Sequence, residues 1–115
     1  MRTILYIDNS RRNLSAISNL LRQHGYRCLT AENYQEAERR FVANPVDLAI
    51  VDQAISEVNG AEVGLQLKSI RGVLVLLLTG SASLSDKPAG VDFLVPKPIE
   101  TETLMRGIAH LLWNV

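Results

Sequence analysis

The sequence DLAIVD, residues 47–52, is a short apolar run that ends in a carboxylate. Three other apolar runs also end in a polar residue: ILYID (4–8), VLVLLLT (73–79) and FLVPK (93–97). Short apolar runs separated by helical stretches are typical of parallel strands. Because the carboxyl ends of parallel strands share one edge, we expect the terminal carboxylates, hydroxyl and ammonium in one crevice. The sequence therefore predicts a site for a phosphoryl group and its metal.

The composition indicates one folded domain. The chain has 115 residues, of which 47% are hydrophobic and 21% charged. Twelve basic and twelve acidic residues cancel, so we expect neither nucleic acid nor a membrane surface as a direct partner. No apolar run approaches the ~20 residues of a membrane helix, and we expect no signal peptide. The single cysteine, Cys28, fits a reducing compartment, and a cytoplasmic location is expected.

The segments between the runs have helical periodicity. Helices are expected after Ser10 to about residue 24, and over 34–43, 61–69 and 100–113; strands are expected over 3–7, 26–30, 47–51, 73–78 and 93–95. The second helix should face inward with Ala37, Phe41 and Val42. The 26–30 strand has the weakest apolar pattern, as an edge strand would. With right-handed crossovers, this alternation predicts a three-layer α/β sandwich around a five-stranded parallel sheet.

Asp52 has three interpretations: a structural cap, a metal ligand or a nucleophile. A lone aspartate at a strand end is most often a cap. Asp8 changes this balance, because the first and third strands should be neighbours and their carboxylates would then meet. Two close carboxylates repel each other, and a divalent cation keeps both ionised. Oxygen ligands, including a backbone carbonyl, suit magnesium.

Thr79 and Lys97 would supply the other half of such a site. A phosphorylated aspartate presents oxygens that need a hydroxyl donor and a cation. The simpler alternatives are a backbone-bonded hydroxyl for Thr79 and a solvent-exposed charge for Lys97. However, Pro96 and Pro98 restrict the backbone around the lysine, which would aim its ammonium, and a cis Lys97–Pro98 peptide is expected.

These pieces together resemble the receiver domain of bacterial two-component response regulators, over essentially all of residues 1–115. The matching segments are ILYID at 4–8, DLAIVD at 47–52, Asn59-Gly60, Leu78-Thr79-Gly80 and Lys97-Pro98-Ile99. The resemblance implies a single receiver domain with a flavodoxin-like fold. It also implies the strand order 2-1-3-4-5.

The resemblance further implies that Asp52 accepts a phosphoryl group from a histidine kinase or a histidine phosphotransfer protein. Thr79 would bond the acyl phosphate and Lys97 would pair with it. The Mg²⁺ site would be built from Asp8, Asn9, Asp52 and the backbone carbonyl of Ala54. Such a domain is a conformational switch rather than an enzyme, with at most slow self-dephosphorylation, and it acts on a downstream effector protein.

Asn9 is the main departure from the family pattern, which has a second acid at this position. By register Asn9 is a direct metal ligand, so the substitution removes a full negative charge. We predict weaker magnesium binding and slower phosphorylation. After the acceptor strand, Ser56 stands where proline is frequent, and Glu57 is most simply a solvated loop charge.

The segment between Thr79 and Lys97 also departs from the pattern. It is short, and its residues 81–88 are poor helix formers, so the fourth helix is expected to be short or missing. Leu94 occupies the position of the family's signalling aromatic, and Phe93 should point to the other face of the sheet. We therefore expect an atypical variant that signals through this loop.

The main alternative is a pseudo-receiver, a phosphorylation-independent protein-interaction module on the same fold. A haloacid-dehalogenase-type phosphatase would need a second aspartate two residues after its nucleophile, but Ser10 follows Asp8 at that spacing. A flavodoxin would need a Ser/Thr/Gly-rich phosphate-binding loop after the first strand, where Asp8 would repel the phosphate. On the last helix, the side with Met105, Leu112 and Trp113 is interpreted as a packed helix end, with a homodimer or partner surface as the alternative.

Overall fold

Five parallel strands form the centre of the computed structural model, which describes residues 1–55, 58–80 and 87–114. The strands are β1 (Thr3–Ile7), β2 (Arg27–Ala31), β3 (Leu48–Asp52), β6 (Leu74–Thr79) and β7 (Phe93–Pro96). Their order is β2-β1-β3-β6-β7. Because β6 and β7 are the fourth and fifth strands of this sheet, the order is the predicted 2-1-3-4-5. The flavodoxin-like fold is confirmed, with β2 at an edge.

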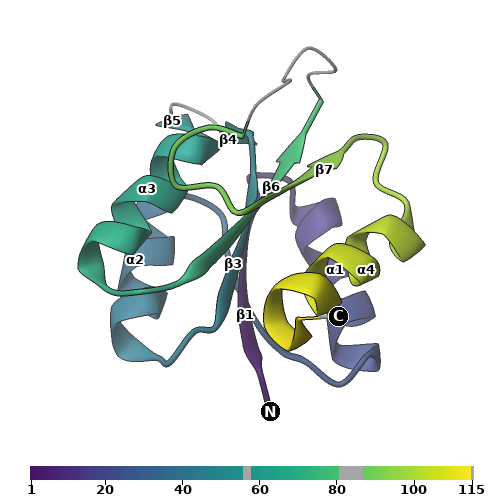
Figure 1. Cartoon of the computed structure of the whole chain (residues 1–115). Helices are drawn as coiled ribbons and strands as arrows, with labels where there is room; N and C mark the ends of the chain where they lie inside the picture. Colours follow the sequence, from purple (N-terminus) through teal and green to yellow (C-terminus); the bar gives the residue numbers. More distant parts are fainter. Residues whose placement is uncertain (56–57, 81–86, 115) are drawn as a thin grey trace.

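Helices cover both faces of the sheet (Figure 1). Helices α1 (Arg11–Gln23) and α4 (Thr101–Trp113) pack on one face, and α2 (Tyr34–Ala43) and α3 (Gly60–Ile70) pack on the other. Side chains of β1 alternate between the two resulting cores: Ile4 and Tyr6 face α1 and α4, whereas Leu5 and Ile7 face α2 and α3. No helix in the described ranges is long and apolar enough to cross a membrane.

Local sequence explains where the helices begin and turn. Ser10 caps α1 by accepting a hydrogen bond from the Asn13 N–H at 3.3 Å. In α2, Ala37 and Phe41 are four residues apart and form the buried face. The prediction that Val42 points inward is wrong, since Val42 is 62% exposed. It lies about 100° further round the helix than Phe41, which turns it to solvent.

A small hairpin follows the acceptor strand, where the sequence predicted only a loop. Strands β4 (Ala54–Ile55) and β5 (Val58–Asn59) pair antiparallel, and α3 begins directly after them. The predictions for Ser56 and Glu57 concern positions outside the described residues. Strands β3 and β6 each begin and end one residue later than expected, so Asp52 and Thr79 belong to the sheet itself.

The described part of the connection from β6 to β7, residues 87–92, packs against α3. The predicted short or missing fourth helix falls largely on residues 81–86, outside the described residues, and the described part, 87–92, contains no helix. There Gly90 adopts φ +83° and packs against Leu65, where a Cβ atom would lie 3.0 Å from the leucine Cδ1. The Asp92 carboxylate accepts hydrogen bonds from the Val75 N–H and the Lys68 ammonium, each at 2.8 Å. These contacts fasten the segment to α3 and β6.

The two residues that begin β7 point to opposite faces, as the alternation predicted. Leu94 packs with the core under α2 and α3. Phe93 packs on the α4 side, against Gly107 and with its ring 5.9 Å from that of His110.

Candidate functional site

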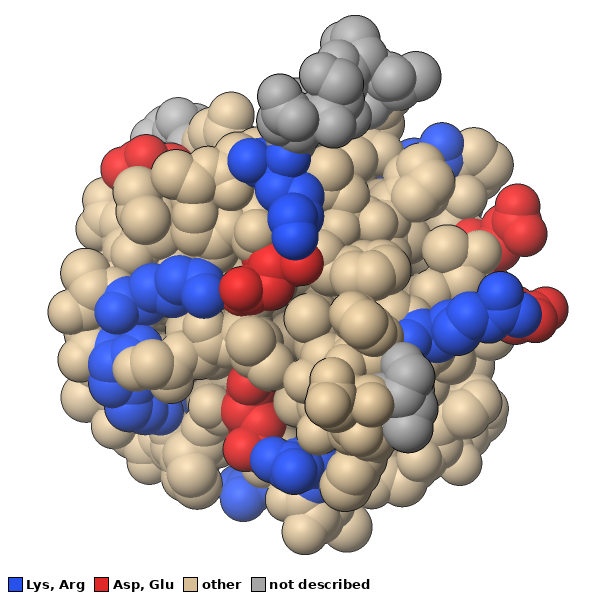
Figure 2. All heavy atoms as spheres, viewed as in Figure 1, with Lys and Arg blue, Asp and Glu red and all other residues tan. Residues whose placement is uncertain are grey.

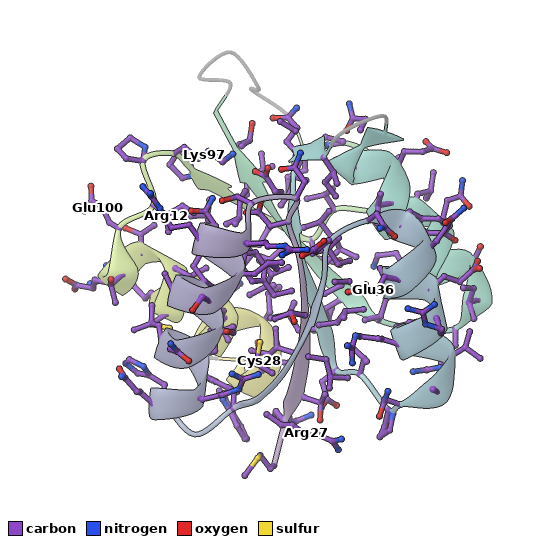
Figure 3. All side chains as sticks on the ribbon, turned by 180° about the vertical axis from the view of Figure 1, so that it is seen from behind. Arg12, Arg27, Cys28, Glu36, Lys97 and Glu100 are labelled. Atoms are coloured by element: carbon purple, nitrogen blue, oxygen red, sulfur yellow. The ribbon has the colours of Figure 1, made fainter. Side chains whose placement is uncertain are left out.

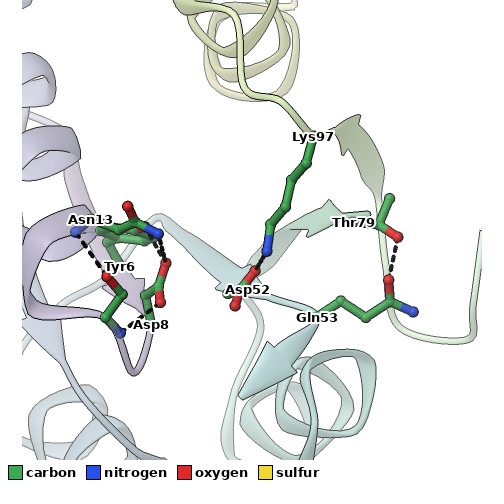
Figure 4. A network of polar contacts seen from close by, with 8 residues as sticks. Tyr6, Asp8, Asn13, Asp52, Gln53, Thr79 and Lys97 are labelled. Carbon is green, nitrogen blue, oxygen red and sulfur yellow. Dashed lines mark hydrogen bonds and ion pairs between the residues drawn. The ribbon is translucent and has the colours of Figure 1, made fainter. Parts of the chain in front are cut away.

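The polar residues predicted to converge do lie at one edge of the sheet (Figure 4). Asp8 follows β1, Asp52 and Thr79 end β3 and β6, and Lys97 follows β7. Strand β1 pairs with β3 so that Ile7 lies opposite Val51, which makes Asp8 and Asp52 neighbours across the ladder. Viewed from behind, Lys97 lies at this end of the sheet and Arg27 at the other (Figure 3).

Asp52 forms an ion pair with Lys97. The lysine Nζ lies beside Oδ1 of Asp52, whose side chain is only 5% exposed. This contact is not a hydrogen bond of regular geometry, and Oδ1 has no such bond within the described part of the chain. The lysine backbone N–H donates to the Thr79 carbonyl at 2.8 Å, and the Lys97–Pro98 peptide is cis, as expected. A buried carboxylate needs either a cation or several hydrogen-bond donors, and for Asp52 the ammonium of Lys97 supplies the compensating charge.

Asp8 is stabilised in a different way, by three neutral donors. The Tyr6 hydroxyl donates to Oδ2 at 2.6 Å and the Asn13 side-chain amide donates to the same oxygen at 3.3 Å. The Ser10 N–H donates to Oδ1 at 2.9 Å. Burial, and then the hydrogen bond to Asp8, raise the pKa of Tyr6 far above its usual range, so the phenol remains a donor.

Sequence reasoning did not identify Tyr6 or Asn13 as site residues. The signal for Tyr6 is a tyrosine within an otherwise aliphatic buried run, because a buried phenol needs a hydrogen-bond partner. The signal for Asn13 is weaker: it lies five residues after Asp8, one helical turn into α1.

Thr79 is buried, and its hydroxyl donates to the side-chain oxygen of Gln53 (Figure 4). Gln53 directly follows Asp52 and was also missed from the sequence. The simple alternative for Thr79, a hydroxyl bonded to backbone, does not describe this contact. The Thr79 hydroxyl is therefore hydrogen-bonded to the residue that follows Asp52.

The residues expected to hold magnesium form a set of oxygen donors. Asp8 and Asp52 are buried, whereas Asn9 and Ala54 are exposed at the same edge, Ala54 as the first residue of β4. Carboxylate, amide and carbonyl oxygens fit a hard cation such as Mg²⁺. Among the described residues no group of three or more His, Cys, Asp or Glu side chains could hold a metal, so two carboxylates are the charged part of this set.

The first residue of α3, Gly60, lies close to the backbone of Asp52. A Cβ atom on Gly60 would lie 2.3 Å from the backbone oxygen of Asp52 and 2.8 Å from Cα of Gln53. Only glycine permits this contact, which fixes the backbone that carries the acceptor. On the other side, a groove of about 620 Å³ opens beside Lys97, between α1 and the start of α4.

The sequence matches the response regulator receiver domain family over residues 4–109, and the chain belongs to this family. It is 29% identical over 116 residues to the heme response regulator HssR of Staphylococcus saprophyticus, covering 97% of this chain and 52% of that protein. The chain spans about half the length of the curated relatives it matches.

Two solved structures of the response regulator TrrA, from Thermotoga maritima, have similar folds. One is a complex with Mg²⁺ and a BeF group, at TM-score 0.87 and 26% identity, covering 97% of this chain and 100% of that one. The other is a complex with the histidine kinase ThkA, at TM-score 0.87 and 29% identity, covering 97% and 99%. These likenesses support a phosphoacceptor switch and do not favour the pseudo-receiver alternative.

Proposed function

We propose that residues 1–115 form one receiver domain that is phosphorylated on Asp52 by a histidine kinase or a histidine phosphotransfer protein. The observation that carries the proposal is the buried carboxylate of Asp52 with the Lys97 ammonium against it, in a chain of the receiver family. The complex of TrrA with its kinase ThkA supports a kinase as the phosphoryl donor.

The chemistry is an in-line displacement. A carboxylate oxygen of Asp52 attacks the phosphorus of a phosphohistidine, the P–O bond forms, and the P–N bond breaks as the imidazole leaves. Lys97 offsets the negative charge on the transferred oxygens. The new group carries about two negative charges and accepts a hydrogen bond from the Thr79 hydroxyl, which changes the position of the β6 end.

Magnesium would be held by Asp8, Asn9, Asp52 and the Ala54 carbonyl, and when bound it would neutralise charge on the phosphoryl oxygens. We propose that its affinity is weakened. Asn9 contributes an amide oxygen without charge, and the oxygens of Asp8 already accept three protein hydrogen bonds. This is the sense in which the site is atypical.

The domain acts as a switch on a downstream effector protein rather than as a metabolic enzyme. Figure 2 shows basic side chains beside acidic ones on the side of the molecule seen in Figure 1, in keeping with the balanced net charge. We therefore propose no direct nucleic-acid or membrane partner. We assign the domain to the cytoplasm. Its single cysteine, Cys28, can form no internal disulfide, as is usual in a reducing compartment; the thiol is buried, and burial raises its pKa to about 11, which keeps it protonated.

The direct test uses a small acyl phosphate such as acetyl phosphate as donor, with magnesium. The phosphorylated residue is located by borohydride reduction and peptide mass spectrometry. The reduced residue is expected at position 52 in the wild-type chain and in Asp47→Asn, a control at the opposite end of β3, and is expected to be absent from Asp52→Asn. Reduction at another carboxylate, or at none in the wild-type chain, would refute the proposal.

A further inference from the structure

Two backbone hydrogen bonds fix the position of Gln53, which lies between Asp52 and Thr79. Its backbone N–H donates to the Leu78 carbonyl at 2.8 Å, and its own carbonyl accepts from the Gly60 N–H at 2.9 Å. The first bond ties Gln53 to β6 and the second ties it to α3. The backbone from which the half-buried Gln53 side chain extends is therefore fixed by β6 and α3.

The side-chain oxygen of Gln53 accepts the hydrogen bond of the Thr79 hydroxyl, whereas the Lys97 ammonium is directed at Asp52 (Figure 4). The backbone of Thr79 is also fastened, because its carbonyl accepts from the Lys97 N–H at 2.8 Å. A threonine side chain occupies discrete staggered rotamers. The hydroxyl can therefore change partner by rotation about the Cα–Cβ bond, without first breaking the strand pairing.

We propose that Gln53 is a positioning residue that holds the Thr79 hydroxyl off the acceptor, so that a phosphoryl group on Asp52 must compete for it. This inference rests on the proposed function. The glutamine favours the unphosphorylated conformation by the worth of one neutral hydrogen bond, which corresponds to roughly a two- to tenfold shift of the switching equilibrium.

The first test measures beryllofluoride affinity at fixed magnesium, by amide NMR titration. Gln53→Met keeps the length of the side chain and removes the oxygen that accepts the hydrogen bond of the Thr79 hydroxyl. It should bind roughly two- to tenfold more tightly than the wild-type chain. The matched control is Gln66→Met on the exposed side of α3, which should bind as the wild-type chain does. Equal affinity in Gln53→Met would overturn the proposal.

The second test needs no phosphoryl mimic. Three-bond couplings to the Thr79 methyl carbon report its χ1 rotamer, and they should indicate one rotamer in the wild-type chain and averaging in Gln53→Met. Unchanged couplings would show that Gln53 does not hold the hydroxyl. If the wild-type chain bound no beryllofluoride, the proposed function would fail, and these couplings would still decide the role of Gln53.

Discussion

The crevice has two halves that stabilise a buried aspartate by different means. In the acceptor half, formed by Asp52, Lys97, Thr79 and Gln53, the carboxylate is paired with a full cation. In the other half, expected to bind the metal and called the metal half below, Tyr6, Ser10 and Asn13 donate three hydrogen bonds to the Asp8 carboxylate beside Asn9. Among the described residues this carboxylate has no ion pair.

This difference supports the proposal that Asp52, and not Asp8, is the carboxylate that reacts. The neutral donors fix the orientation of Asp8 and occupy part of the hydrogen-bonding capacity of its oxygens. The ammonium of Lys97 lies against Oδ1 of Asp52, which accepts no regular hydrogen bond from the described residues, and it places positive charge where phosphoryl oxygens would arrive. We therefore propose Asp52 as the nucleophile and Asp8 as a supporting residue. Substitutions in each half of the crevice test this difference.

The largest effect is expected from Lys97→Met, which removes the cation of the acceptor half. Phosphorylation of Asp52 by acetyl phosphate should slow by about a hundredfold, the usual cost of losing one preorganised charge stabiliser. The control is Lys68→Met, which removes a partly buried ion pair with Asp92 far from the crevice. Equal rates in the two variants would mean that Lys97 has no part in the transfer.

Gly60→Ala should disturb the acceptor half through its backbone. The added methyl would meet the Asp52 carbonyl oxygen and Cα of Gln53, neither of which can move aside cheaply. We expect a loss of about 3 kcal/mol in the free energy of unfolding, measured with urea. Gly72→Ala, where nothing lies within 4 Å of the new atom, should change it by less than about 1 kcal/mol. Similar losses in both would remove the tight contact from the account.

Tyr6→Phe tests the metal half. It removes one donor from Asp8 without changing the ring, so we expect a loss of about 2 kcal/mol in unfolding free energy, as for a buried hydrogen bond to a charged group. Tyr34→Phe removes an exposed hydrogen bond to Glu38 and should cost about 0.5 kcal/mol or less. If Tyr6→Phe were as mild as its control, the neutral donors would not be what stabilises Asp8.

The smallest effect is expected from Asn9→Asp, which adds a carboxylate to the metal half. Magnesium affinity, measured by calorimetric titration, should rise about tenfold because a charged oxygen replaces a neutral one. Asn19→Asp on the exposed side of α1 adds the same charge away from the crevice and should leave the affinity unchanged. An Asn9→Asp variant no tighter than its control would contradict a weakened site.

The sequence was sufficient for the features that depend on period and strand ends. The meeting of Asp8, Asp52, Thr79 and Lys97 follows from apolar runs that end in polar residues, whereas the order of the strands came from the resemblance to receiver domains. The hairpin at 54–59 was missed because two-residue strands show no periodicity. The apolar side chain of Val42 predicted an inward position, but Ala37 and Phe41 alone form the buried face of α2.

Hydrogen-bond partners inside the crevice were beyond sequence reasoning for a different reason. The contact of Gln53 with Thr79 and that of Tyr6 with Asp8 depend on rotamers chosen after the strands pair. The Gln53 contact crosses from one strand end to another, so the spacing of these residues along the chain carries no signal for it.

A magnesium-dependent titration with beryllofluoride, followed by NMR amide shifts around Asp52, Thr79 and Lys97, shows whether Asp52 is the phosphoryl acceptor. Saturable shifts at these residues are expected in the wild-type chain and none in Asp52→Ala. Persistent shifts in Asp52→Ala, or no shifts in the wild-type chain at millimolar magnesium, would contradict Asp52 as the phosphoryl acceptor.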